Sequence, residues 1–140
     1  MRLPLQLPAP QDHPALVATL NAFGTTLLRE ASQPHVIAVF RLAIGETESS
    51  PDIAETLDTL GRAQTRQALS RLFVHSQTAA FIGPGNTGDM ADDFIALLWR
   101  GGLLMRLQLA TIAAPSQKEC ERRAHAATLS LLRLYPIPTA

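Results

Sequence analysis

The sequence predicts an all-α protein, an orthogonal or antiparallel bundle of about five to six helices. Apolar residues recur at the spacing of one helix face, as in Leu16, Leu20, Phe23 and Leu27. No segment alternates apolar and polar residues as a half-buried strand does. Capping and helix-breaking residues separate the apolar stretches. These three observations favour a helical bundle.

The N-terminal stretch differs from the rest of the chain. Residues 1–11 are rich in proline, so we expect them to be extended and to lay their leucines on the domain surface. The folded domain is expected over residues 12–136. Its first helix begins at Asp12, whose carboxylate can cap it, and Pro14 is tolerated in the first turn.

The second and third helices are expected to begin near Ser32 and Ser50. The apolar face of the second consists of Val36, Val39, Phe40, Ala43 and Ile44. Ser50 supplies a capping oxygen to the third, which is expected to bury Ile53, Leu57 and Leu60. Gly61 marks a break or kink, after which a longer helix runs to Phe81 and carries Leu69, Leu72, Phe73 and Ala80.

Two long helices close the chain. The penultimate one is expected to start near Thr87 or Asp89, after a glycine-rich turn, and to run to about Ala113. It is apolar on nearly every side, so it must be covered on every side. Gly101 and Gly102 lie within it and indicate either close approach by another helix or ligand, or a kink. Ser116 and Glu119 form the capping box of the last helix, which ends before Pro136.

Composition excludes several functions. Lys plus Arg and Asp plus Glu number 12 each, so no basic excess is available to neutralise phosphates, and the chain alone is expected to bind DNA poorly. The one cysteine excludes an internal disulfide and favours the cytoplasm. The most apolar stretch of the sequence contains Arg100, Arg106 and Gln108. Because such side chains are costly at the centre of a bilayer, we do not expect this stretch to span a membrane.

No motif predicts catalysis, a metal or a cofactor. Gly83, Gly85 and Gly88 match G-x-G-x-x-G, but a helix precedes them where a nucleotide fold has a strand, so a plain turn is expected. Glu121 and His125 lie one turn apart among arginines, which is typical of surface pairing. Cys120 has no recognisable base beside it. We therefore predict that the chain is not an enzyme.

Three stretches resemble the C-terminal regulatory domain of TetR-family repressors of the proteobacterial type. Residues 40–46, followed by 50–54, resemble the family's second core helix and the start of the next. Residues 97–106 resemble the penultimate helix, and 126–135 resemble the closing helix. The likeness extends from Pro14 to Tyr135. The family's N-terminal helix-turn-helix has no counterpart, which implies that residues 1–11 are a remnant of the domain junction.

The resemblance implies a core that binds a small apolar effector and forms a homodimer, its last two long helices building an intersubunit four-helix bundle. DNA would be contacted only through the missing N-terminal domain. Pocket candidates are Phe23, Leu27, Phe40, Arg41, Ile44, Phe73, His75, Trp99, Arg100 and Met105. Interface candidates are Trp99, Leu103, Arg106, Leu107, Ala124, Ala127, Leu131 and Tyr135. The alternative is a stand-alone helical interaction module, similar to an antirepressor, without DNA or ligand activity of its own.

Overall fold

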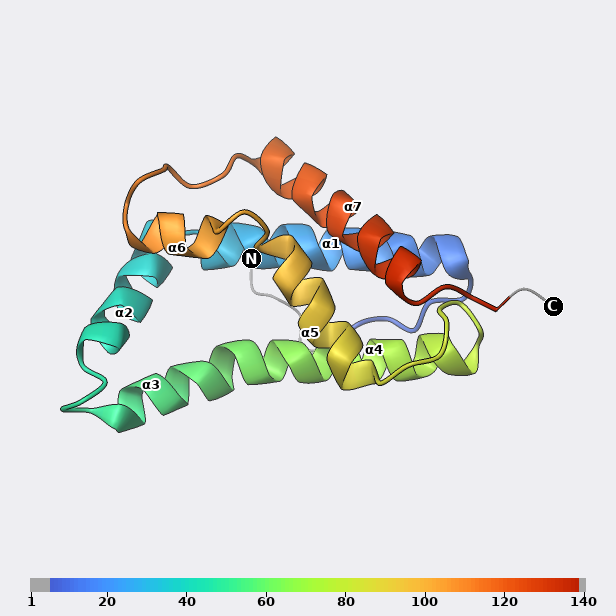
Figure 1. The fold of residues 1–140 in the computed structure, drawn as a ribbon, viewed down its shortest axis with the longest axis horizontal. Helices are drawn as coiled ribbons and strands as arrows, with labels where there is room; N and C mark the ends of the chain where they lie inside the picture. Colours follow the sequence, from blue (N-terminus) through green and yellow to red (C-terminus); the bar gives the residue numbers. More distant parts are fainter. Residues whose placement is uncertain (1–5, 139–140) are drawn as a thin grey trace.

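A computed structural model describes residues 6–138, and this part of the chain is helical with no strand. In chain order the α-helices are α1 (His13–Ala31), α2 (Pro34–Gly45), α3 (Pro51–Asp58), α4 (Gln64–Thr78), α5 (Thr87–Leu98), α6 (Leu103–Gln108) and α7 (Gln117–Leu134). A π-helical turn, η1 (Thr59–Ala63), joins α3 to α4, so these three form one rod along an edge of the molecule (Figure 1). The all-α prediction is confirmed.

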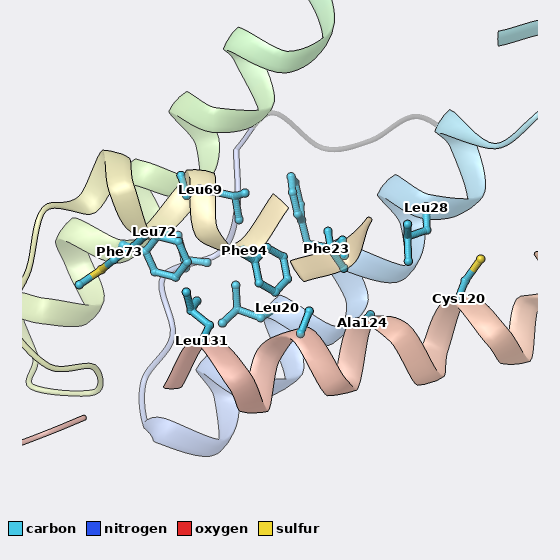
Figure 2. Close-up of a cluster of buried hydrophobic side chains, with 14 of the residues drawn as sticks. Leu20, Phe23, Leu28, Leu69, Leu72, Phe73, Phe94, Cys120, Ala124 and Leu131 are labelled. Carbon is cyan, nitrogen blue, oxygen red and sulfur yellow. The ribbon is translucent and has the colours of Figure 1, made fainter. Parts of the chain in front are cut away.

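The core lies where α1, α4, α5 and α7 meet. Figure 2 shows Leu20, Phe94 and Leu131 pointing into one cluster with Leu69 and Phe73. All five are fully buried. Burying a side chain of this size contributes about 1.5–3 kcal/mol, so this cluster is the main source of stability.

Helix α1 begins as its sequence predicts. The Asp12 carboxylate accepts a hydrogen bond from the Ala15 amide at 2.8 Å. Gly24 allows α1 to approach its neighbours, because a Cβ there would lie 2.9 Å from Leu98 Cδ2 and 3.0 Å from Ala124 Cβ. Half of the predicted capping box forms in the last helix: Ser116 Oγ accepts from the Glu119 amide at 3.1 Å, while the Glu119 carboxylate accepts from Arg122. These two helices run antiparallel and pack closely.

The buried stripes predicted for α2 and α3 are wrong. Of the five residues predicted for α2, Ala43 alone is buried; Val39 and Ile44 are exposed. Helix α3 buries no residue, and Ser50 stands at its N-cap without a side-chain cap hydrogen bond. The physical reason is position: α2 and α3 lie to one side of the core (Figure 1), so several of their apolar side chains, Val39, Ile44 and Ile53 among them, stay exposed.

The rod does not break at Gly61. The chain passes through the π-helical turn of η1, which absorbs the glycine and leaves the helix continuous. The rod ends at Thr78, three residues before the predicted end, and Ala80 adopts φ +61 instead of packing inside. A left-handed residue of this kind is a common way to end a helix.

The single penultimate helix is also wrong. Helix α5 ends at Leu98, and Gly101 (φ +79) and Gly102 (φ +70) are both left-handed, which no α-helix interior accommodates. The chain turns there and resumes as the short α6. A Cβ on either glycine would meet nothing within 4 Å. The glycines therefore serve backbone conformation, not close approach by another helix of the same chain.

The N-terminal segment lies on the domain as predicted, so far as the structure describes it. Leu7 packs against the core and Pro10 is buried. The Pro10 carbonyl accepts a hydrogen bond from His75 Nε2 at 3.1 Å. The first two leucines of the segment, Leu3 and Leu5, lie outside the described residues. Within the described range, none of the helices has both the length and the apolar character needed to cross a membrane.

Candidate functional site

The first candidate surface is the outer face of α5 and α7, called the α5/α7 face below. The two helices run antiparallel and are fastened at both ends (Figure 1). At one end the Arg123 guanidinium donates to the Arg100 carbonyl at 2.8 Å and to the Leu98 carbonyl at 3.4 Å. At the other end the Tyr135 hydroxyl donates to the Asp93 carboxylate at 2.5 Å. These hydrogen bonds hold α5 and α7 in a fixed position relative to each other.

A groove of about 220 Å³ lies between the C-terminal end of α5 and α7. It is lined by Leu97, Arg100, Gly101, Arg122, Arg123, Ala126, Ala127 and Ser130. Ligand pockets for small molecules usually exceed about 300 Å³ and are enclosed. This groove is smaller and partly basic, and small residues are among those that line it. Its shape suits the side chains of another helix better than an apolar molecule.

Hydrogen bonds shift two ionisations on this face. The Glu119 carboxylate accepts from Arg122, and this bond lowers the pKa of Glu119 below its ordinary value. The hydrogen bond from Tyr135 to Asp93 raises the pKa of the phenol to about 12, because loss of that proton would place two negative charges together. Both groups therefore keep their usual charge near neutral pH.

The second candidate surface is apolar and is called the α2/α3/α6 surface below. Of the 12 exposed large hydrophobic residues found over the described range, 7 lie on α2, α3, η1 or α6, and an eighth, Leu109, follows α6 directly. They are Val39, Leu42, Ile44, Ile53, Leu60, Leu104, Met105 and Leu109. Exposed apolar residues scattered singly are ordinary, whereas their concentration on consecutive elements makes this region a candidate for ligand binding.

The side chain of Arg41 links α2 to α6. The Arg41 guanidinium donates to the carbonyls of Gln108 at 3.0 Å and Leu107 at 3.3 Å, which caps the C-terminal end of α6. This bond ties α2 to α6. Arg41 is therefore occupied by backbone, and it is less available to a polar ligand group than the sequence suggested.

The ten predicted pocket residues are dispersed. Phe23 and Phe73 are buried in the core, and Leu27 and Trp99 are half-buried against it. Phe40 is half-buried near Gly61, and Ile44 and Met105 belong to the α2/α3/α6 surface. His75 holds the N-terminal segment, and Arg100 lines the α5/α7 groove. Of the ten, Arg100 alone lines that groove.

The predicted interface residues mostly pack inside the chain. Leu103, Leu107, Ala124, Ala127 and Leu131 are each at most 5% exposed, so a partner would meet their neighbours instead. Arg106 is exposed on α6, and Trp99 and Tyr135 are half-buried. The residues that face outward beside them are Ala96, Ala126, Leu129 and Ser130. Helical periodicity groups the residues of each helix into faces, but it does not say which face α1 covers. The outward-facing residues can be identified only with that knowledge.

The side chains considered for chemistry have structural partners. Glu121 accepts from Gln117 at 2.9 Å, and His125 Nδ1 is 3.3 Å from Asn21 Nδ2. Over residues 6–138 no three His, Cys, Asp or Glu side chains gather in a way that would hold a metal ion. Cys120 is buried, and burial raises the pKa of its thiol. A buried neutral thiol is a poor nucleophile.

Comparison with known proteins decides the family. Residues 18–137 match the family of AefR-like transcriptional repressors, C-terminal domain. The chain belongs to this family of TetR-type regulators. Because the family is regulatory and not enzymatic, the domain is a regulator and not an enzyme.

A solved structure shares the fold. It is described as a putative TetR-family transcriptional regulator from Mesorhizobium loti, with a TM-score of 0.75 at 16% sequence identity. The alignment covers 89% of this chain and 64% of that one, so the present chain spans less than two thirds of that regulator. No curated protein matches the sequence significantly. The DNA-reading part of such regulators has no counterpart in residues 6–138.

Proposed function

We propose that this domain senses a small, largely apolar effector and holds two repressor chains together as a homodimer. The α2/α3/α6 surface would bind the effector, and the α5/α7 face would bind the second copy. The observation that carries the sensing role is the concentration of exposed apolar side chains on α2, α3, η1 and α6. Membership in a family of regulatory domains supports assigning effector binding and dimerisation to this domain.

The effector would act by closing the α2/α3/α6 surface. Water now contacts apolar side chains such as Leu42 and Met105, which are 64% and 63% exposed. A ligand that covers them gains about 25 cal/mol per Å² of apolar area removed from water. The gain is available only when α2, α3 and α6 lie around the ligand, so binding shifts the domain toward that arrangement.

The π-helical turn offers the hinge for such a shift. Turns of this type interrupt the regular ladder of α-helical hydrogen bonds and recur at functional sites. Here η1 divides α3, which buries nothing, from α4, which is part of the core. Movement of α3 about η1 would leave the core unchanged. In a dimer, such a movement would reorient DNA-binding domains joined to the N-terminal segments. The effector's difference in affinity for the two arrangements limits how far it can shift the equilibrium between them.

Dye binding tests the sensing proposal. We expect the apolar fluorescent probe 8-anilinonaphthalene-1-sulfonate to bind the folded domain, and Ile44→Glu and Met105→Glu each to weaken binding at least about fivefold, because a charge on the surface opposes an apolar ligand. Val74→Glu is the matched control, since Val74 is also exposed but lies on α4. Equal loss of binding in all three variants, or none in any, would rule out this surface as the effector site.

A further inference from the structure

The α2/α3/α6 surface is acidic where α2 turns into α3. Over residues 42–57 the chain contains four carboxylates and no Lys, Arg or His. The four are Glu46, Glu48, Asp52 and Glu55, and all are exposed. Acidic and basic residues are equal in number over the whole chain, so this excess of negative charge is local.

The basic residues on the same elements compensate this charge only in part. Arg41 donates to two backbone carbonyls at the end of α6, and Arg62 pairs with Asp58 at 2.8 Å. Arg106, exposed on α6, is the third basic residue of α2, α3, η1 and α6. The four carboxylates of residues 42–57 form no ion pair with another residue of 6–138. A positively charged ligand would therefore not compete with an existing ion pair for them.

The end of α2 adds to the negative potential at this turn. Helix α2 ends at Gly45, and its last turn contains no basic residue. The C-terminal end of a helix has a partial negative charge, which favours a cation nearby. Glu46 follows directly, so a full negative charge lies beside the partial one.

Exposed apolar side chains flank the same turn. Leu42 and Ile44 at the end of α2 are 64% and 61% exposed, and Ile53 at the start of α3 is 46% exposed. An apolar chain that covers them is favoured whatever its head group. A positive head group is attracted by the turn as well, whereas a negative one is repelled.

We infer that the effector is a cationic amphiphile, with its apolar part on α2 and α3 and its ammonium group at Glu46 and Glu48. This inference rests on the proposed effector site and adds the charge of the ligand. Both carboxylates are exposed to solvent, so their attraction discriminates between ligands of opposite charge more than it raises affinity, and it weakens as salt is added.

Two probes of equal chain length isolate the charge. Decylammonium and decanoate have the same apolar chain and opposite charges at neutral pH, and isothermal titration calorimetry below their micelle concentrations gives both dissociation constants. The dye used to test the site contains a sulfonate, so it reports apolar surface but not this preference. We expect decylammonium to bind wild type at least about fivefold more tightly than decanoate at about 20 mM salt. At about 500 mM salt we expect the two affinities to agree within about twofold.

A double variant locates the preference. E46Q/E48Q removes two charges but retains the shape of both side chains, and we expect it to weaken decylammonium binding about threefold without weakening decanoate binding. The control A22K/V74K changes the net charge by the same amount at exposed positions of α1 and α4. We expect this control to retain the wild-type preference within about twofold. Circular dichroism verifies that both variants fold.

The possible results separate the inference from the site on which it rests. Equal binding of the two probes, or tighter binding of decanoate, overturns the cationic effector and leaves the effector site in place. Binding of neither probe removes the site and this inference together. Equal weakening of decylammonium in E46Q/E48Q and A22K/V74K assigns the preference to net charge and overturns the location. If E46Q/E48Q does not fold, a wild-type preference that is unchanged by salt contradicts the inference, and one that salt abolishes supports it.

Discussion

Gly24 provides the most discriminating test of the packing. It is buried in the middle of α1, where α5 and α7 both approach. In Gly24→Ala the new Cβ would lie 2.9 Å from Leu98 Cδ2 and 3.0 Å from Ala124 Cβ. Carbon atoms are in favourable contact at about 3.5–4.0 Å, so both distances are too short. The leucine can turn aside, but the Cβ of Ala124 moves only if α7 moves.

Two opposing effects determine how Gly24→Ala changes the free energy of unfolding. Alanine inside a helix is about 1 kcal/mol more favourable than glycine. Overpacking a filled core typically costs about 1–3 kcal/mol. Because the clash with α7 is between two short side chains, we expect the steric term to win and the free energy of unfolding to fall by about 1 kcal/mol. Ala124→Gly should partly rescue Gly24→Ala, since it removes one of the two overlapping carbons.

Urea unfolding followed by circular dichroism measures both effects at a fixed protein concentration. Ala22→Gly is the control for helix propensity, because Ala22 is exposed in the same helix, and it is expected to cost about 1 kcal/mol. A double-mutant cycle should give a coupling of about 1 kcal/mol between positions 24 and 124. A stabilised Gly24→Ala protein, or strictly additive effects, would refute the close contact of α1 with α7.

Three further predictions concern the core, the α5–α6 turn and the C-terminal end of α7. Phe94→Ala should lower the free energy of unfolding by about 3–5 kcal/mol in the same assay, because Phe94 is fully buried; a loss under about 1 kcal/mol would contradict its position. Gly101→Ala should cost about 1 kcal/mol because its φ is +79; a gain would indicate a continuous helix. The phenol of Tyr135, the one tyrosine of the chain, should titrate at about pH 12 by ultraviolet absorbance and nearer its ordinary pKa of 10.0 in Asp93→Asn. Because folding raises this pKa, the associated stability is present below about pH 10 and is lost as the pH rises through about 12; equal midpoints in the two proteins would disprove the hydrogen bond.

The sequence predicted most of the fold where local signals and packing agree. Asp12 and Ser116 mark helix starts by side-chain caps that form in the structure. The apolar spacing of Leu16, Leu20 and Phe23 identifies a face that is buried. In these helices the periodic face has a neighbour to cover it, so pattern and burial coincide.

The prediction of burial failed on α3 and η1, which bury no residue. Ile53 and Leu60 have helical spacing, yet no element of the fold lies over them. Periodicity shows that a face is apolar but not what covers it. The same limit applies to Gly101 and Gly102. Apolar residues on both sides of these glycines predicted one continuous helix, but periodicity does not reveal the left-handed backbone that follows α5.

The site residues named from the sequence stay predictions, and the structure shows where their side chains lie. The α5 and α7 segments were identified from their resemblance to a known domain, yet residues such as Ala124 and Leu131 face inward. Helix α7 has small residues on adjacent faces, and tertiary packing determines which of them are buried. Ala126 and Ala127 differ by one position and lie respectively outside and inside the fold. That choice depends on α1 and cannot be read from α7 alone.

Sedimentation equilibrium of the wild-type chain beside Ala126→Arg tests the central claim most directly. Ala126 is exposed in the α5/α7 groove, so arginine there leaves the core intact but places a bulky charge in the proposed interface of both copies. Ala22→Arg, exposed on α1, is the control. The account predicts a wild-type dimer, an unchanged Ala22→Arg dimer and a folded Ala126→Arg monomer. A wild-type monomer, or a dimer insensitive to Ala126→Arg, would contradict it.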